Sequence, residues 1–407
     1  MLIQTQQQFD VIIYGASVAG IAAAIRYAQN GVRVALIDPP MTNDYKDRLD
    51  YVTSSADKLL RSLLQHESSP AIPGKVEFWT RWGWIRSDAA NQGYFVHQHE
   101  LRERLLNYAH ETSGITRFHG AAAEQIIRHG STVTGIQIQQ GGRDYPLQLL
   151  ARLIVVAGDV NARFASMLNL KQAQTGRVYF RAFYELSGLP RAQFWLLEPD
   201  VAAIIAHGSR LTEVIYAPTS LAAFQQDTEG HFAHALAGLP DAPYVPDSTR
   251  ISQVMRMETT LGIGQADHHA GLAFIGAAKL ALPLFRANQM SMEIQSAHWL
   301  VENTLQALMV TGELENALHA YRQQHRQATR AYQQHNDELA NGRRFNNAEK
   351  LALAAAAHNP AAAARFFAYL NQSITRSQLL KPDSIFYALL SKREPIPDPP
   401  VSVPQSS

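Results

Sequence analysis

The sequence contains no cysteine among its 407 residues. This absence excludes disulfides, thiolate metal sites, iron–sulfur clusters and thiol nucleophiles. An excess of charge of one sign is also lacking, because 36 basic and 35 acidic residues leave a formal net charge of +1. A broad nucleic-acid-binding surface is therefore not expected, and we predict no nucleic-acid partner.

Long hydrophobic runs are absent as well. The longest apolar stretch, residues 351–370, is interrupted by His358, Asn359 and Pro360, so no segment has the length of a membrane span. Residues 1–10 lack the basic segment and the apolar run of a signal peptide. We therefore expect a cytoplasmic protein. Its hydrophobic content of 46% allows a large core in two or three packed units.

The first part of the chain has the pattern of a strand–helix–strand unit. Residues 9–14 (FDVIIY) form an apolar run typical of a buried parallel strand. Residues 18–30 are rich in alanine and predict a helix that Gly31 can close. Residues 32–38 (VRVALID) predict a second buried strand. Together these segments make a βαβ unit.

The rest of the chain predicts a separate sheet and further helices. Residues 176–260 alternate short strand-like runs with turns, which indicates a mostly antiparallel sheet. We expect helices over 99–112, from about 288, over 313–340 and from Pro360, and a buried strand over 272–276.

The turn of the βαβ unit reads Gly15-Ala16-Ser17-Val18-Ala19-Gly20, a Gly-x-Ser-x-x-Gly version of the dinucleotide-binding fingerprint. The first glycine permits the tight turn, the last permits close packing of the helix, and serine is small enough for a diphosphate to approach the backbone. The helix start offers free amides and the positive end of the helix dipole to phosphates. The candidate cofactor-binding residues here are Gly15, Ala16, Ser17, Ala19 and Gly20.

Asp38 lies at the end of the second strand, where a carboxylate accepts hydrogen bonds from ribose hydroxyls. The fingerprint and this acid, in a strand–turn–helix–strand context, predict dinucleotide binding. The alternative is a βαβ unit whose small residues serve packing only. Because the unit is followed by a separate sheet, FAD is favoured over a nicotinamide nucleotide as the tightly held ligand.

Four segments, residues 11–38, 81–114, 153–168 and 272–297, resemble FAD-dependent monooxygenases of the aromatic hydroxylase type, within them the flavin-dependent halogenase-like branch. The resemblance covers nearly the whole chain. It implies an α/β fold in which a FAD-binding Rossmann-like βαβ domain carries an inserted, mostly antiparallel substrate sheet and is followed by C-terminal helices. The implied ranges are 1–172 with 262–310 for the FAD-binding domain, 173–261 for the sheet, 311–392 for the helices and 393–407 for a disordered tail.

The resemblance also marks positions where this chain departs from the family. Gln98 stands where the family has an arginine that reaches the FAD phosphates. Asp159 lies one place later than the aspartate of the family's Asp-Gly fingerprint. Gly276 is followed by Ala277, where the family has an aspartate on the ribityl chain of the flavin. Arg48 is a further candidate for binding the cofactor.

The family loop after Pro283 is rich in glycine, but this chain has Arg286 and Ala287 there. A lost charged hydrogen bond is worth about 1.5–3 kcal/mol, so the loss of both the arginine and the aspartate weakens FAD binding by roughly two to four decades. Arg286 can compensate by placing a cation near the flavin or its phosphates. The sequence therefore predicts weak or unusual flavin binding.

Two functions from different classes follow. The first is an FAD-dependent monooxygenase that hydroxylates or oxidises an organic substrate in a specialised biosynthetic pathway. It would use NAD(P)H or a partner flavin reductase as the source of electrons. Its substrate would be a small molecule, a carrier-tethered group or a protein. The second is a degenerate member of the fold without flavin redox activity, acting in non-redox chemistry or as a binding partner of another enzyme. We favour the first, because the adenosine end of the site looks intact.

Few side chains are expected to take part in the chemical step, and no catalytic residue is assigned. Arg181, Tyr184 and Tyr216 lie on predicted strands of the inserted sheet and are candidates for substrate contact. His97 and His99 are expected on a strand, on the face opposite Gln98. No metal site is expected, because the spacing of ligand residues and a third ligand are missing.

Overall fold

The computed structural model describes most of the chain. The described residues are 6–40, 49–65, 75–86, 93–142, 145–158, 166–168, 175–186, 191–207, 210–243, 245, 249–260, 269–280, 289–310, 312–340, 342–371 and 374–380. The site candidates Arg48, Asp159, Arg286 and Ala287 lie outside these residues, and so does the predicted tail.

A five-stranded parallel sheet forms the centre of the part of the molecule that contains the βαβ unit. Its order is β18 (Leu272–Ile275), β12 (Leu153–Ala157), β2 (Val11–Tyr14), β3 (Val34–Asp38) and β8 (Ile115–His119). Every residue of β2, β3, β12 and β18 is buried, because both faces of the sheet are covered. Continuous apolar runs are typical of such strands.

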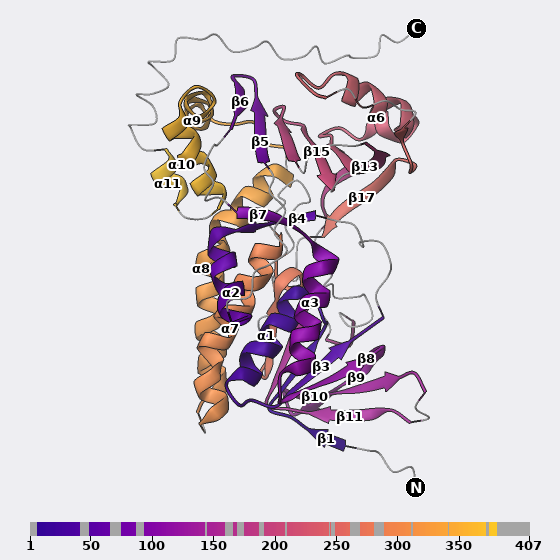
Figure 1. The fold of residues 1–407 in the computed structure, drawn as a ribbon, viewed down its shortest axis with the longest axis vertical. Helices are drawn as coiled ribbons and strands as arrows, with labels where there is room; N and C mark the ends of the chain where they lie inside the picture. The colour runs from indigo at the N-terminus through magenta and orange to yellow at the C-terminus, as the bar shows by residue number, and fades with distance from the viewer. Residues whose placement is uncertain are drawn as a thin grey trace.

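The two faces of the parallel sheet are covered by different layers. The odd-numbered residues of β2 pack against the helices α1 (Val18–Gln29), α3 (Gln98–Glu111) and α7 (Gln289–Met309). The even-numbered residues pack against a four-stranded sheet. The strands of that sheet, in order, are β1 (Gln6–Gln8), β11 (Leu147–Leu150), β10 (Thr132–Gln140) and β9 (Ala121–His129). Figure 1 shows these layers below the second, larger sheet.

The larger sheet has seven strands and is antiparallel except at one pairing. Its order is β17 (Met255–Thr260), β13 (Thr175–Glu185), β16 (Leu211–Ala217), β15 (Val201–His207), β14 (Arg191–Leu196), β5 (Lys75–Thr80) and β6 (Gly83–Ile85). β14 and β5 are parallel neighbours. The predicted division assigns residues 75–85 to the FAD-binding part, whereas in the structure they extend this sheet.

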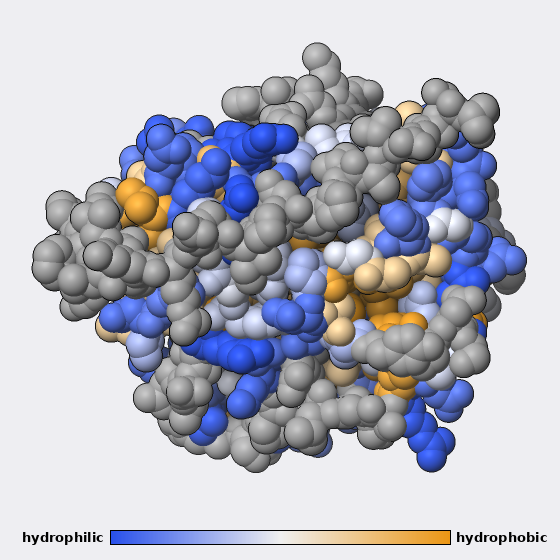
Figure 2. Space-filling model, turned by 90° about the horizontal axis from the view of Figure 1, so that it is seen from above, coloured by the Kyte–Doolittle hydropathy of each residue, from blue (hydrophilic) through white to orange (hydrophobic). Residues whose placement is uncertain are grey.

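The seven-stranded sheet is covered on both faces. One face packs on the two-stranded sheet of β4 (Leu49–Thr53) and β7 (Gly93–His97). The other face packs on α5 (Ala222–Gln226) and α6 (Thr228–Ala237). From above, Figure 2 shows apolar residues gathered in a hollowed part of this end of the molecule, with hydrophilic residues around them.

The remaining helices are α2 (Ser54–Leu63), α8 (Leu314–Ala340), α9 (Asn347–His358), α10 (Pro360–Leu370) and α11 (Arg376–Leu379). Asn359 caps α10 by accepting hydrogen bonds from the amides of Ala361 and Ala362, which confirms the predicted helix start. Figure 1 shows α8 along the part that contains the parallel sheet and α9 to α11 beside β5 and β6. In the described parts of the chain, no helix combines the length and the apolar character needed to cross a membrane.

The α/β fold expected from the sequence is confirmed, and one local prediction is wrong. Strand β7 ends at His97, and helix α3 begins at Gln98. Gln98 and His99 are therefore helical, so strand alternation does not set the directions of their side chains. The change from strand to helix occurs where the chain turns from β7 back along the α1 side of the parallel sheet.

Candidate functional site

The turn between β2 and α1 needs both of its glycines for packing. Gly15 has φ +111°, and a Cβ atom there would lie 1.7 Å from the carbonyl oxygen of Ala157 on β12. A Cβ atom on Gly20 would lie 2.0 Å from the carbonyl oxygen of Gly15. These close approaches explain both glycines through the backbone itself. The two glycines are therefore not by themselves evidence that a nucleotide binds here.

The start of α1 offers amide groups to an anion. Ser17 is the N-cap, and its hydroxyl accepts a hydrogen bond from the amide of Gly20 at 3.3 Å. Within the described part of the chain, no residue accepts a hydrogen bond from the amides of Ser17 or Val18. The amide of Ala19 donates to the carboxylate of Glu293 on α7, with an N–O distance of 3.3 Å. One of the first-turn amides is thus already used by an acidic side chain.

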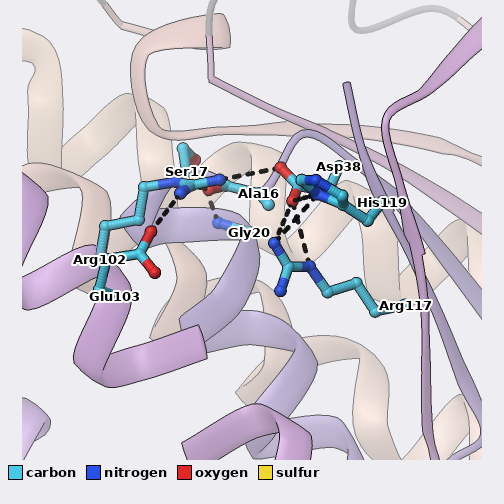
Figure 3. Close-up of polar contacts among 8 residues, drawn as sticks. All are labelled: Ala16, Ser17, Gly20, Asp38, Arg102, Glu103, Arg117 and His119. Carbon is cyan, nitrogen blue, oxygen red and sulfur yellow. Dashed lines mark hydrogen bonds and ion pairs between the residues drawn. The ribbon is translucent and has the colours of Figure 1, made fainter. Parts of the chain in front are cut away.

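Asp38 lies at the end of β3 with an exposed fraction of 2%, and the protein's own side chains engage both of its carboxylate oxygens (Figure 3). Arg102 Nη2 donates to Oδ1 at 2.8 Å. Arg117 Nε donates to Oδ2 at 3.1 Å, and His119 Nδ1 lies 2.9 Å from the same oxygen. A ribose that binds Asp38 must share these oxygens or displace a donor.

Arg102 places a cation next to the turn of the βαβ unit. Its Nε donates to the carbonyl oxygen of Ala16 at 2.8 Å, and its Nη1 lies 2.9 Å from a carboxylate oxygen of Glu103 (Figure 3). Arg102 follows Gln98 by one helical turn, so the two residues lie on the same face of α3. Arg102 thus places a cation one helical turn after Gln98.

Arg102→Met is expected to weaken FAD binding by about 10- to 150-fold, the equivalent of one charged hydrogen bond of about 1.5–3 kcal/mol. Fluorescence titration with FAD measures this change. Arg104→Met, two residues along the same helix, removes the same charge from a different face and is expected to leave the affinity unchanged. Tighter FAD binding by Arg102→Met would contradict this role, because it would show that Arg102 blocks the site.

The segment around Gly276, a candidate for binding the cofactor, lies beside the start of α1. Gly276 begins the short 3-10 helix η2 (Gly276–Ala278) with φ +59°, and its amide donates to Ser296 Oγ on α7 at 2.9 Å. Ala277 follows it without a carboxylate, so this turn has no acid for a ribityl chain. Gln98 begins α3.

The structure does not bring the three substrate candidates together. Arg181 lies on the face of the seven-stranded sheet that packs on β4 and β7, together with Tyr179 and Ile215. Tyr184 and Tyr216 belong to the opposite face, which packs on α5 and α6. Tyr216 donates to Asp200 Oδ2 at 2.7 Å. Burial raises the pKa of the Tyr216 phenol, and the negative charge of Asp200 raises it further.

Arg181 is part of a buried polar chain that links the seven-stranded sheet to β4. Arg181 Nη1 lies 3.5 Å from Glu213 Oε1, and His207 Nε2 lies 3.0 Å from Glu213 Oε2. The amide of Leu49 donates to His207 Nδ1 at 2.7 Å. Because Nδ1 accepts this bond, the proton of a neutral His207 is on Nε2 and is donated to Glu213.

Several residues around the start of α1, Asp38 and Arg181 were not predicted from the sequence: Arg102, Arg117, His119, Glu293, His207 and Glu213. Arg102 was detectable as a basic residue four positions after Gln98. Arg117 and His119 alternate on one strand, but only the order of the strands brings them to Asp38. Glu293 is the one acidic residue among the buried residues of α7, which are mostly apolar.

The donors at the start of α1 fit the diphosphate of a nucleotide. They combine first-turn amides, the small Ser17 and the guanidinium of Arg102 beside Ala16, and these groups favour an anion. Asp38 fits a ribose if the ribose shares the carboxylate oxygens with the present donors or displaces one of them. Glu293 opposes the diphosphate, because it brings a negative charge to the same amides.

The chain is similar in fold to several flavin-dependent proteins of known structure. A flavoprotein/dehydrogenase from Cytophaga hutchinsonii has a TM-score of 0.72 at 14% identity, over 94% of this chain and 98% of that one. The flavin-dependent brominase Bmp2 has a TM-score of 0.70 at 15% identity, with the same coverage. The p-nitrophenol 4-monooxygenase PnpA from Pseudomonas putida DLL-E4 has a TM-score of 0.66 at 13% identity, over 96% of this chain and 100% of that one. The expected resemblance to FAD-dependent monooxygenases is confirmed for the fold.

A weaker similarity was found in sequence. A probable electron transfer flavoprotein-quinone oxidoreductase, YdiS of Escherichia coli K12, is 27% identical over 210 residues, which are 46% of this chain. The match spans less than half, 45%, of that curated relative. No family model matches the chain.

Proposed function

We propose that this protein is an FAD-dependent oxidoreductase of the monooxygenase type that holds its flavin weakly. The observation that carries the proposal is a fold shared over 94% of the chain with a flavin-dependent brominase and a flavoprotein dehydrogenase. The start of α1 and Arg102 supply donors for a diphosphate at the point where such a fold binds a dinucleotide.

The chain's own residues have distinct roles in this proposal. The amides of Ser17 and Val18 and the guanidinium of Arg102 hold the diphosphate, and Asp38 holds the ribose. The flavin, when bound and reduced by NAD(P)H or by a partner flavin reductase, would supply the reaction of O2 with an organic substrate, in which one oxygen atom enters the substrate and the other leaves as water. The substrate, a small molecule, a carrier-tethered group or a protein, is used in a specialised biosynthetic pathway. Of the three substrate candidates, Arg181 lies on the sheet face toward β4 and β7.

The visible absorption spectrum of the purified protein tests this proposal. We expect excess FAD to bind with a shift of the flavin bands and to be lost on desalting, because Gln98 and Ala277 replace two charged contacts. NAD(P)H oxidation is then measured with FAD present. If the flavin bands do not shift at any FAD concentration, the oxidoreductase proposal fails.

A second candidate function is a protein of the same fold without flavin redox activity, acting in non-redox chemistry or as a binding partner of another enzyme. The observation that favours it is the occupation of the site by the protein itself. Arg102, Arg117 and His119 engage Asp38, and Glu293 engages the amide of Ala19. The same titration separates the two, since this candidate predicts no bound flavin.

A further inference from the structure

Glu293 is an acidic residue on the buried face of α7. Its exposed fraction is 4%, and its neighbours Met292 and Ile294 are also buried. Its Oε2 lies 3.3 Å from the amide nitrogen of Ala19, in the first turn of α1. The acid thus comes from a segment 274 positions away in the sequence, yet it lies at the start of the helix that would receive a diphosphate.

The surrounding backbone is shaped to admit this side chain. A Cβ atom on Gly276 would lie 2.8 Å from Ala19 Cβ and 3.2 Å from Glu293 Cγ. The missing side chain of Gly276 therefore leaves room for Glu293 to reach α1. Ser296 Oγ accepts a hydrogen bond from the amide of Gly276 at 2.9 Å and donates to the carbonyl oxygen of Glu293 at 3.0 Å. These bonds hold the first turns of α7 against η2.

The electrostatics of the helix start contribute to the stability of this buried acid. A carboxylate at a helix N-terminus is stabilised by the free amides and by the helix dipole, which offsets part of the cost of burying its charge. The same amides and the same dipole are what bind a phosphate group. A diphosphate placed there would meet a buried negative charge, and like charges repel strongly where water is excluded.

We propose that Glu293 is an internal anion of the nucleotide site, which occupies the start of α1 and lowers the affinity of this site for nucleotide diphosphates. This inference rests on the proposed function, because it concerns the same site. The diphosphate binds fully only when the carboxylate leaves the amide of Ala19. Weak flavin binding is then a property built into α7, in addition to the missing contacts at Gln98 and Ala277.

The test is isothermal titration of Glu293→Gln with FAD and, separately, with ADP, which carries the diphosphate but no flavin ring. Glutamine has nearly the same shape, and its amide oxygen can accept from the Ala19 amide, so the packing is kept while the charge is removed. We expect both ligands to bind at least tenfold more tightly than to the wild type, which is about 1.4 kcal/mol. Circular dichroism of the free protein checks that the variant is folded.

Glu302→Gln is the matched control. It removes an acid from the same helix at an exposed position, where Glu302 pairs with His298, and it is expected to leave both affinities unchanged. Equal affinities of wild type and Glu293→Gln would overturn the inference and leave the proposed function standing. Tighter ADP binding by Glu293→Gln without any FAD binding would support the inference and overturn the proposed function. If Glu293→Gln bound neither ligand, both would be wrong.

Discussion

Gly15→Ala is expected to destabilise the protein by about 3–5 kcal/mol, a large effect for one methyl group. The new Cβ would lie 1.7 Å from the carbonyl oxygen of Ala157, and both atoms belong to the backbone framework of adjacent parallel strands. Neither can turn away as a flexible side chain would. The strands β2 and β12 would have to move apart, and this movement would disturb the packing of the core on both faces of the sheet. Urea denaturation followed by circular dichroism measures the loss.

Gly31→Ala is the control for backbone conformation alone. Gly31 has φ +81°, similar in sign to Gly15, but a Cβ atom there has no neighbour within 4 Å. It is expected to cost about 1–2 kcal/mol, the strain of a left-handed residue. If the two variants were equally stable, the close approach at Gly15 would not be what requires glycine.

Glu213→Ala is expected to cost about 3–5 kcal/mol, because it leaves two buried donors without their acceptor. The side chains of Glu213 and His207 are each 1% exposed, and that of Arg181 is 6% exposed. The guanidinium loses its counter-charge, and Nε2 of His207 loses the oxygen to which it donates. The measurement is again urea denaturation, with the signal followed at more than one wavelength to detect separate unfolding of the seven-stranded sheet.

Glu258→Ala provides the comparison at the surface. Glu258 pairs with Arg256 at 2.8 Å, but the two side chains are 38% and 56% exposed, so the expected cost is about 0–1 kcal/mol. Glu213→Gln should fall between the two, since it keeps an acceptor and removes the charge. A cost of Glu213→Ala as small as that of Glu258→Ala would show that the buried chain from Arg181 to Leu49 adds nothing to stability.

Local patterns in the sequence were sufficient for the α/β class and for the first βαβ unit. The runs at 9–14 and 32–38 are apolar on both sides because both faces of their sheet are buried, and this pattern is specific to such strands. The caps at Ser17 and Asn359 mark helix starts through short-range hydrogen bonds. These signals need only a few neighbouring residues, so they can be read from one sequence.

The partners of Asp38 could not be read in this way. Asp38 was expected to bind ribose, and its partners within the protein come from β8 and α3. Which strand lies beside β3 is a matter of sheet order, which no local pattern records. The hydrogen bond from the amide of Ala19 to Glu293 depends in the same way on the packing of α7 against α1.

The separation of Arg181 from Tyr184 was within reach of the sequence, whereas that of Arg181 from Tyr216 depends on the register of β13 and β16. Side chains along a strand alternate between its two faces. Arg181 and Tyr184 are three positions apart on β13, so they must point to opposite faces. Tyr216 pairs with Phe180, which also lies on the face away from Arg181.

The parallel pairing of β5 with β14 affects how fast the chain folds. Residues 75–80 and 191–196 are neighbours in the sheet although more than a hundred residues separate them. Closing so long a loop makes this pairing intrinsically slow. Until it closes, β14 is an open sheet edge, a ready template for aggregation. A fragment cut to 173–261 keeps that edge permanently and is expected to be poorly soluble, so the inserted sheet is not a transferable module.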